Sequence, residues 1–468
     1  MKPLFARYAR VHMVGIGGAG MEGLARLLAA MGATVSGSDR ADSEALAGLR
    51  RDGFPVKLGH EAAGVEGADL VVYSAAVPQD NPELEAARQR GIPQVGRAEV
   101  LGEVSRLYLT LAVAGSHGKT TTASMAADIL VQAGWEPSVL VGGWRRGRVH
   151  ARLGSGRFLV AEADEFRRAF LSLYPSFAVV TSVDAEHLDC YADLGAVEEA
   201  FCAFLERLPF YGHALVSGDG TVGRRLLEGA GRPRLTYGLG RDNHYRATAV
   251  AAQAWGSGFC VWRGDERLGE ITLRVPGEHN VRNALGAAAL CHSIGVDFAT
   301  IGQALSAFGG VQRRFEVRGE AGGVLVVDDY AHHPTEITAA LQTARRTGRR
   351  VLAAFQPHLY SRTQALSAGF AQALCAADQV VLTEIYPSRE EPIPGVDAGL
   401  IAGGMRALGY RQVERVADLE ALTRRLLEAC RSGDLVITLG AGDITGVPER
   451  LLQGLAAAAA GPRPARGA

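Results

Sequence analysis

Lysine is scarce in this chain. It occurs only at Lys2, Lys57 and Lys119 in 468 residues, so arginine supplies 46 of the 49 basic residues. The 50 acidic residues leave a formal net charge of −1, which gives no electrostatic reason to expect a nucleic-acid partner. Charged residues make up 21% and hydrophobic residues 47% of the chain, a balance that excludes an intrinsically disordered protein.

Cysteine pairs and long apolar runs are also missing. The six cysteines contain no C-x-x-C pair, which argues against a zinc cluster or a disulfide framework and favours a reducing compartment. No run of 18 apolar residues predicts a membrane span, and the first residues lack the apolar stretch of a signal peptide. We therefore expect a cytoplasmic protein without a membrane partner. Glycine is abundant, with 59 residues, but it shows no G-X-Y period.

Strand-like and helix-like segments alternate along the whole chain, which predicts an α/β protein with largely parallel sheets. The strand–turn–helix pattern restarts near residue 107 and again after Arg314, before the strand in GVLVVDDYAHHP. We expect three domains: a Rossmann-like domain over 1–106, a central α/β domain over 107–314 and a second Rossmann-like domain over 315–468.

The first glycine-rich turn lies between a predicted strand and a predicted helix. Residues 15–20 satisfy G-x-G-x-x-G, and Asp39 ends the next strand, where a ribose-binding carboxylate is expected. Such a turn brings backbone N–H groups close to a diphosphate at the start of a helix. One interpretation is a nicotinamide or flavin dinucleotide site. The other is a phosphate-binding turn of the kind that many α/β folds carry, and this motif alone leaves the ligand open.

The second glycine-rich turn, residues 115–122, reads GSHGKTTT after an apolar strand. Its sequence predicts a P-loop, in which amides cradle phosphate, Lys119 reaches the β/γ oxygens and Thr120 offers a hydroxyl to Mg²⁺. The first glycine of the full pattern is replaced by Val113, so the loop is a variant. A GTPase would also need an N-K-x-D segment to read guanine, and the positions of the three lysines exclude one.

Carboxylates follow two predicted strands of the central domain. The first group contains Glu162, Asp164 and Glu165, and the second is the segment 184–189, which includes His187. Oxygen ligands at the carboxyl ends of neighbouring strands suit Mg²⁺. Each of these side chains taken singly also fits a solvated helix cap, whereas the whole set favours a metal site.

Taken together, the P-loop, Glu162, His187 and the segment GEHNVRN at 277–283 resemble the Mur ligase family of ATP-dependent amide-forming enzymes. The segments HMVGIGGAGMEGLA, VVYSAAVPQDNPEL, DDYAHHPTEI and FQPHLYSRT resemble those members that join L-alanine to UDP-N-acetylmuramate in peptidoglycan precursor synthesis. The murein-peptide-recycling members, which attach a tripeptide to the same sugar, remain the alternative. An NAD-linked oxidoreductase would leave the P-loop and GEHNVRN without a role.

The resemblance implies a role for specific residues of each domain. The UDP-sugar would be bound in the first domain by Gly15, Gly17, Gly18, Ala19, Gly20, Asp39 and Ser74. ATP would be held in the central domain by Gly115, Ser116, His117, Gly118, Lys119, Thr120, Thr121, His279, Asn280 and Asn283. Mg²⁺ would be bound by Thr120, Glu162 and His187. The catalytic groups would be Lys119, His187, Arg313, His332, His358 and Arg362, with Tyr330 and His332 facing L-alanine in the third domain.

The implied reaction transfers the γ-phosphoryl group of ATP to the sugar carboxylate, and the amine of L-alanine then attacks the acyl phosphate. A histidine such as His332 or His358 is a suitable base for the amine, although a histidine in HHP also fits a helix cap. The chain departs from the family pattern at Ser116, His150, Ser182 and Glu186. It has no lysine after Lys119, so it lacks the carbamylated lysine used by the members that add later residues.

Overall fold

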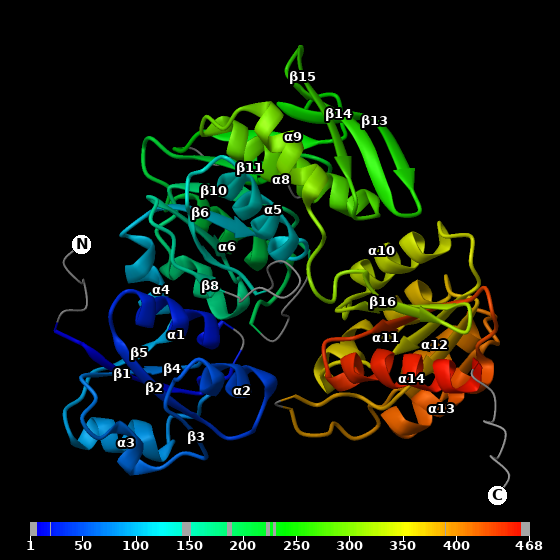
Figure 1. Ribbon diagram of the computed structural model, residues 1–468, viewed down its shortest axis with the longest axis horizontal. Coiled ribbons are helices and arrows are strands. Elements are labelled where there is room, and N and C mark those ends of the chain that lie inside the picture. Colours follow the sequence, from blue (N-terminus) through cyan, green and yellow to red (C-terminus); the bar gives the residue numbers. More distant parts are fainter. Residues whose placement is uncertain are drawn as a thin grey trace, which may run out of the picture. The chain divides into compact units, whose positions relative to one another are not determined.

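The computed structural model describes residues 7–18, 20–142, 151–184, 190–220, 225–227, 231–388 and 390–459. The chain divides into two compact units. The first unit comprises residues 1–250, 259–272 and 280–308, and the second comprises residues 251–258, 273–279 and 309–468. The described residues form three β-sheets with flanking helices (Figure 1), which confirms the predicted α/β class with three domains.

The first sheet has five parallel strands in the order β3-β2-β1-β4-β5. Its strands are β1 (Arg10–Val14), β2 (Thr34–Asp39), β3 (Val56–Leu58), β4 (Leu70–Tyr73) and β5 (Gln94–Gly96). Its helices are α1 (Met21–Ala30), α2 (Glu44–Arg51), α3 (Pro82–Gln89) and α4 (Arg97–Ser105), with the 3₁₀ turn η1 (Ala62–Val65). Because strands are added on one side of β1 and then on the other, the glycine-rich turn after β1 lies at a topological switch point, where ligands of such sheets bind.

The second sheet has ten strands in the order β15-β14-β13-β12-β11-β10-β6-β9-β7-β8. They are β6 (Leu109–Ala114), β7 (Ser138–Leu140), β8 (Ala151–Arg152), β9 (Phe158–Glu162), β10 (Phe177–Val180), β11 (His213–Ser217), β12 (Arg234–Gly238), β13 (Tyr245–Gln253), β14 (Gly256–Arg263) and β15 (Glu266–Leu273). The central strand β6 is apolar and almost fully buried, and it pairs in parallel with β9 and β10, as expected for a sheet covered on both faces. The accompanying helices are η2 (Phe166–Ser172), α5 (Lys119–Gln132), α6 (Leu194–Leu205), α8 (Glu278–Ser293) and α9 (Phe298–Ala307).

The third sheet has the order β16-β17-β21-β18-β19-β20, with β16 antiparallel to β17 and the other pairings parallel. Its strands are β16 (Glu316–Ala321), β17 (Val324–Asp329), β18 (Val351–Phe355), β19 (Gln379–Leu382), β20 (Val413–Arg415) and β21 (Leu435–Leu439). Alternate strand residues pack on α10 (Pro334–Arg345), α11 (Tyr360–Leu374) and α12 (Gly399–Ala407) on one face. The other face packs on α13 (Leu419–Ala429) and α14 (Val447–Ala459), with η3 (Asp443–Gly446) between β21 and α14.

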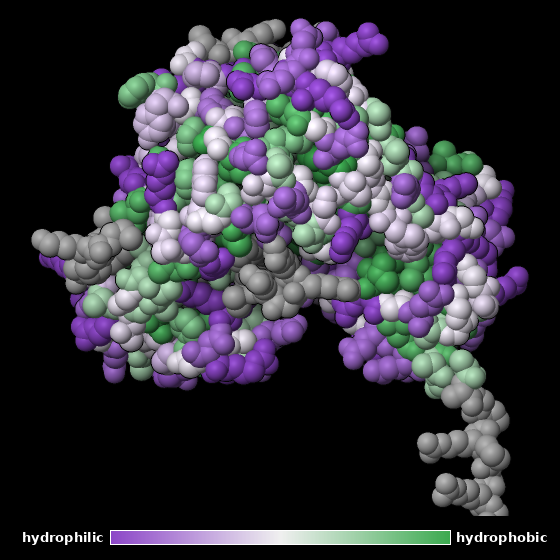
Figure 2. Space-filling view, turned by 45° about the horizontal axis from the view of Figure 1, so that its top comes forward, coloured by the Kyte–Doolittle hydropathy of each residue, from purple (hydrophilic) through white to green (hydrophobic). Residues whose placement is uncertain are grey.

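Hydrophilic side chains cover much of the face drawn in Figure 2, with smaller hydrophobic areas between them. Among the described residues, none of the helices is both long and apolar enough to cross a membrane.

The aromatic cluster beneath η2 provides a test of the central core. Phe170 is 1% exposed. Its ring stacks on that of Phe204, with centroids 4.9 Å apart, and lies edge-on to that of Phe201, with centroids 5.2 Å apart. Phe170→Ala should lower the free energy of unfolding by about 3–5 kcal/mol because it removes these contacts and leaves a cavity. Urea unfolding checks this. The control is Phe210→Ala, at a ring that is 84% exposed, and an equal loss in both variants would contradict the assignment.

Candidate functional site

The glycine-rich turn of the first domain is held by the neighbouring strand β2. The N–H groups of Gly15 and Ile16 donate to the carbonyl of Ser38 at 2.9 and 3.0 Å, and the Gly17 N–H donates to the Asp39 carboxylate at 3.0 Å. Gly15 and Gly20 have φ values of 76° and 77°, in the left-handed region that favours glycine. Gly20 is the N-cap of α1 and brings no side chain of its own to the start of the helix.

The predicted first-domain residues Gly15, Gly17, Gly18 and Ser74 lie together. A Cβ on Gly15 would be 3.2 Å from the Cβ of Ser74, and one on Gly18 would be 3.7 Å from the Ser74 hydroxyl. Asp39 lies beside them, but its carboxylate accepts the Gly17 amide, so it braces the turn itself. Ala19, predicted with this group, lies outside the described residues.

The P-loop joins β6 directly to α5. Gly118 has φ 81° and is the N-cap of α5, which begins at Lys119. The Lys119 ammonium donates to the Ser116 carbonyl at 3.1 Å and to both oxygens of Glu165 at 3.0 Å. Glu165 is 1% exposed, so the lysine is held by a buried carboxylate next to the loop. The strand–turn–helix arrangement expected for residues 115–122 is present, and it places the amides of the loop and the lysine where a phosphate-binding turn needs them.

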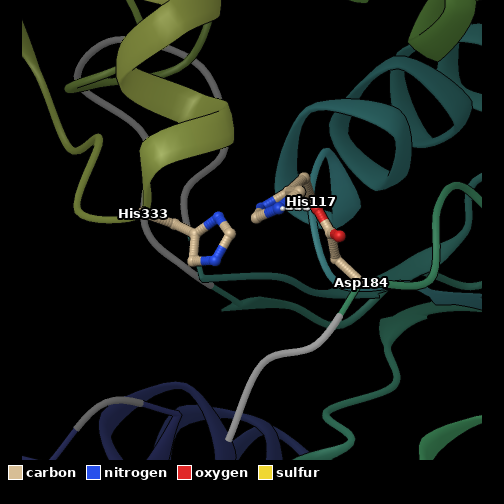
Figure 3. Close-up of side chains that lie close together, drawn as sticks. All are labelled: His117, Asp184 and His333. Carbon is tan, nitrogen blue, oxygen red and sulfur yellow. Dashed lines mark hydrogen bonds and ion pairs between the residues drawn. The ribbon is translucent and has the colours of Figure 1, made fainter. Parts of the chain in front are cut away.

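The segment after β10 fastens the P-loop from the other side. The Ser182 hydroxyl accepts the His117 N–H at 3.0 Å, and the Ser116 hydroxyl accepts the Asp184 N–H at 2.8 Å. The His117 ring lies 3.1 Å from the Asp184 carboxylate (Figure 3). Ser182, one of the departures from the family pattern, thus supplies a hydrogen-bond acceptor to the loop.

Two of the three predicted metal ligands, Glu162 and Thr120, lie within the described residues. Glu162 ends β9 and is in register with Val113 of β6, two residues before the P-loop, and its carboxylate accepts the Gly142 N–H at 2.6 Å. Thr120 follows Lys119 in the first turn of α5. A carboxylate and a hydroxyl are oxygen ligands of the type that Mg²⁺ prefers, so these two residues fit that ion. His187 and Glu186 lie outside the described residues, as does His150.

The start of α8 lies against the P-loop. A Cβ on Gly118 would be only 2.4 Å from the Asn283 carboxamide oxygen, and the Asn283 amide donates to Asn280 at 3.3 Å. Both asparagines are buried, and their donors and acceptors lie beside the P-loop. His279, predicted with them, belongs to the second unit, where its ring packs over Gly277.

An ion pair that the sequence analysis did not identify anchors this helix. Asp219 accepts the amides of Leu239 and Gly240 at 2.7 and 3.0 Å and pairs with Arg282 of α8 at 3.3 Å. Burial alone would raise the pKa of Asp219, but these hydrogen bonds and the Arg282 charge lower it overall. The short SGDG segment gives no local signal for this contact, because the two partners are 63 residues apart.

In the second unit, the predicted residues Tyr330 and His332 follow β17, and His358, which follows β18, lies next to them. The rings of Tyr330 and His332 have centroids 5.1 Å apart, and those of His332 and His358 are 6.0 Å apart. His358 also stacks on Tyr386 at 5.8 Å. Arg362, in the first turn of α11, has a buried guanidinium nitrogen, Nη1, without a hydrogen-bond partner among the described residues. A buried unpaired donor of this kind suits an anionic ligand such as an amino-acid carboxylate.

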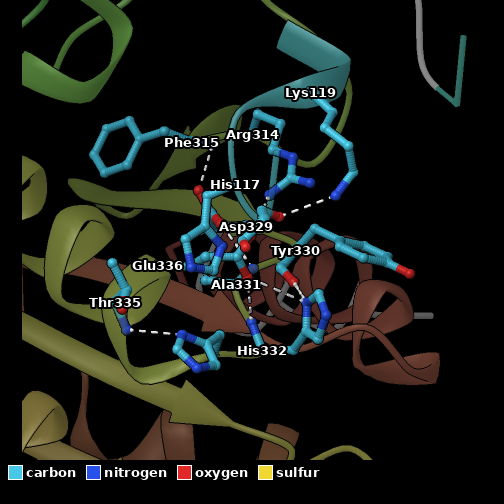
Figure 4. A network of polar contacts seen from close by, with 12 residues as sticks. His117, Lys119, Arg314, Phe315, Asp329, Tyr330, Ala331, His332, Thr335 and Glu336 are labelled. Carbon is cyan, nitrogen blue, oxygen red and sulfur yellow. Dashed lines mark hydrogen bonds and ion pairs between the residues drawn. The ribbon is translucent and has the colours of Figure 1, made fainter. Parts of the chain in front are cut away.

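The carboxylates of Glu336 and Asp329 accept backbone N–H groups around the segment that follows β17 (Figure 4). Glu336 accepts the His332 N–H at 3.1 Å, and Asp329 accepts the amides of Phe315 and Ala331 at 2.7 and 2.8 Å. Burial raises the pKa of Asp329 to about 6, although Arg314 and these two amides favour its ionised form. Burial also lowers the pKa of His332 to about 3, with Glu336 opposing the shift.

His333, the second histidine of HHP, caps a helix, which is one of the two roles that the sequence left open for a histidine in this motif. His333, drawn in Figure 3, is the N-cap of α10, and its side chain accepts the Thr335 N–H at 3.4 Å.

The predicted catalytic residue Arg313 has φ 56°. It donates to the Gly440 carbonyl at 2.5 Å and pairs with the buried Asp328 at 3.4 Å. Its guanidinium also lies 4.8 Å from the centre of the Tyr330 ring. The structure therefore connects Arg313 to Tyr330 within the second unit.

Comparisons with known proteins cover almost the whole chain. The model of the Mur ligase family catalytic domain matches residues 10–109, that of the Mur ligase middle domain residues 113–291, and that of the Mur ligase glutamate ligase domain residues 313–442. A UDP-N-acetylmuramate–L-alanine ligase of Oleidesulfovibrio alaskensis is 47% identical over 96% of this chain and 100% of its own length.

Solved structures agree with these matches. A UDP-N-acetylmuramate–alanine ligase from Thermotoga maritima is 30% identical with a TM-score of 0.81, covering 95% of this chain and 98% of that one. A murein peptide ligase from Psychrobacter arcticus is 26% identical with a TM-score of 0.73, covering 96% of this chain and 99% of that one.

The contact between Gly118 and Asn283 predicts a specific loss of nucleotide binding. Gly118→Ala should weaken ATP binding at least tenfold, because the methyl group meets Asn283 and the left-handed backbone is strained. Calorimetric titration with ATP measures the effect. Gly134→Ala is the matched control at the other end of α5: its φ is 72°, but no atom lies within 4 Å of the added methyl group. ATP binding that falls equally in both variants would contradict the predicted contact.

The lowered pKa of His332 predicts a pH dependence of stability. Its pKa is about 3 in the folded chain against 6.5 in an ordinary setting, so below pH 6.5 the unfolded chain takes up a proton that the folded chain does not. Its contribution is therefore complete above pH 6.5 and falls as the pH drops towards 3. Between neutral pH and pH 5, the free energy of unfolding should fall more in the parent than in His332→Asn, by about 2 kcal/mol.

Urea unfolding of the two proteins at both pH values measures this difference, and the other titrating groups cancel in the comparison. Parallel pH profiles for the parent and His332→Asn would show that the histidine is not held neutral.

Proposed function

Because the chain belongs to the Mur ligase family, we propose that it joins L-alanine to the lactyl carboxylate of UDP-N-acetylmuramate, with ATP converted to ADP and phosphate, in peptidoglycan precursor synthesis. The family resemblance drawn from the motifs is confirmed by these matches. The observation that carries the choice of reaction is the 47% identity to an L-alanine ligase over essentially the full length of both chains.

In this proposal each of the three domains binds one substrate. Residues 1–106 bind the UDP-sugar at the turn after β1, residues 107–314 bind ATP at the P-loop, and residues 315–468 bind the amino acid. The first boundary lies between α4 and β6 and the second lies just before β16, so each proposed domain keeps its sheet intact. The strand ends support this division. Predicted site residues follow directly after the carboxyl ends of β1, β6 and β17.

The sugar carboxylate is a poor electrophile and has to be activated before an amine can attack it. The carboxylate oxygen of the sugar attacks the γ-phosphorus of ATP, the bond to the β–γ bridging oxygen breaks, and ADP leaves. The neutral amine of L-alanine then attacks the carbonyl carbon of the acyl phosphate, phosphate leaves, and the amine gives up a proton as the amide forms. Negative charge develops on phosphoryl oxygens in both steps, and Lys119 and Arg313 offset it.

The residues present fit a magnesium ion in this reaction. Thr120 and Glu162 supply oxygen ligands, and His187 is proposed to hold a second ion near the acyl phosphate. When bound, Mg²⁺ neutralises phosphate oxygens and orients them for in-line attack. Asn280 and Asn283 are proposed to read the adenine edge, since two carboxamides offer both donors and acceptors.

Of the two histidines proposed as base, His358 is the better assignment. A side chain with a pKa of about 3, as for His332, is uncharged at neutral pH but holds a proton too weakly to take one from an ammonium group. We therefore propose that His332 and Tyr330 line the amino-acid site and that Arg362 binds the carboxylate of L-alanine. His358 is proposed to accept the proton that the amine releases. We also propose a cytoplasmic location, which the family resemblance implies for enzymes of peptidoglycan precursor synthesis.

A coupled assay tests the proposed reaction. ADP should be released only when ATP, Mg²⁺, UDP-N-acetylmuramate and L-alanine are all present, and Lys119→Ala should lower the rate by at least a hundredfold because the transferred phosphoryl group loses its cation. Retained binding of UDP-N-acetylmuramate by the variant is the control for folding. ADP release at the same rate without the sugar nucleotide would exclude the proposed function.

A panel of acceptors in the same assay separates the related reactions. L-alanine, glycine, L-serine and the murein tripeptide are compared at equal concentrations. Preference for the tripeptide would identify a murein-peptide-recycling ligase instead, a class to which this chain also shows structural likeness.

A further inference from the structure

Arg97 lies directly against the glycine-rich turn of the first domain, although the sequence analysis assigned it no role. It is the first residue of α4, and its guanidinium covers Gly20, the N-cap of α1. A methyl group on Gly20 would be 2.2 Å from Nη1 of Arg97 and 3.2 Å from its Cζ. The cation is therefore in contact with the glycine at the point where the turn becomes a helix.

The position of Arg97 on its own helix is electrostatically unfavourable. The N-terminus of a helix carries a partial positive charge, which favours acidic side chains in the first turn and disfavours cations. α4 nevertheless begins with arginine after Gly96, a residue that caps it without a side-chain hydrogen bond. The N-terminus of α1 adds a second partial positive charge at Gly20. The guanidinium of Arg97 therefore lies at the N-terminus of α1, where two positive groups meet and an anion would stabilise them.

The partner of Arg97 in this structure is weak. Its Nη2 lies 3.7 Å from Oδ2 of Asp164, beyond hydrogen-bond distance, and the Asp164 side chain is 45% exposed. An exposed pair at this distance contributes little to stability. The other Asp164 oxygen accepts the Phe166 N–H at 3.0 Å, so the aspartate keeps a structural role when Arg97 leaves it.

From this geometry we infer that Arg97 binds the diphosphate of the sugar nucleotide and exchanges Asp164 for it. The inference rests on the proposed function, which puts that diphosphate at the turn after β1. A planar guanidinium presents paired N–H donors that match phosphate oxygens, and its contact with Gly20 places these donors beside the amides of the turn. Asp164 precedes Glu165, the partner of Lys119, so the exchange takes place one residue away from the carboxylate at the ATP site.

Calorimetric binding of UDP tests the inference, with uridine measured by competition as the phosphate-free probe. Arg97→Ala should weaken UDP binding at least tenfold, change uridine binding less than threefold and leave ATP binding unaltered. Arg97→Lys should lie between the two, because it keeps the charge and loses the paired donors. Arg90→Ala is the matched control, since Arg90 follows α3 in the same domain and pairs with Glu66 at 3.1 Å. It should bind UDP like the parent.

The exchange with Asp164 has its own test. Asp164→Asn keeps the oxygen that accepts the Phe166 amide but removes the competing charge, so UDP should bind about two- to fivefold more tightly. Unchanged UDP binding in Arg97→Ala, or an equal loss for UDP and uridine, would overturn the role of Arg97, and unchanged or weaker UDP binding in Asp164→Asn would overturn the exchange. Failure of the parent itself to bind UDP and UDP-N-acetylmuramate would instead refute the proposed function.

Discussion

A glycine in the left-handed region at the start of a helix is the constraint on which both proposed phosphate sites depend. Gly20 and Gly118 have φ values of 77° and 81°, and each is the N-cap of the helix that follows its strand. A side chain at either position would meet Arg97 or Asn283. Each turn thus has a group packed on its glycine, and each helix terminus is oriented for an anion.

The two turns also share the way in which their cations are held. Lys119 is paired with Glu165 at 3.0 Å, and Arg97 lies 3.7 Å from Asp164. These carboxylates are neighbours in the segment that follows β9, which ends in the proposed metal ligand Glu162. A short acidic segment therefore lies beside the cations of both proposed phosphate sites. Because phosphoryl transfer brings two anionic substrates together, control of these few charges is central to the proposed reaction.

Much of this arrangement could be predicted from local sequence. The glycine turns, the apolar strands before them and the helices after them are short-range patterns, and the lysine of the P-loop is easily recognised in a chain with three lysines. The clustering of Tyr330, His332 and His358 follows from two strands, β17 and β18, whose carboxyl ends lie at the same edge of a sheet.

The pairings between distant segments could not be predicted in this way. Asp219 with Arg282 and Glu165 with Lys119 depend on how helices pack on the sheet, and no spacing in the sequence encodes those contacts. The same holds for the division of roles in HHP, because burial determines that His332 stays neutral while His333 caps α10. Ser182 shows the converse, since a departure from the family pattern keeps a hydrogen bond to the P-loop.

The central claim is that the sugar carboxylate is activated by direct phosphorylation. It is tested most directly with UDP-N-acetylmuramate carrying ¹⁸O at both oxygens of its lactyl carboxylate, with the released phosphate examined by mass spectrometry. If an acyl phosphate forms, the carboxylate oxygen that attacked the γ-phosphorus leaves with it, and each phosphate should contain one ¹⁸O from the sugar. Phosphate without ¹⁸O, formed at the same rate as the amide product, would contradict the claim.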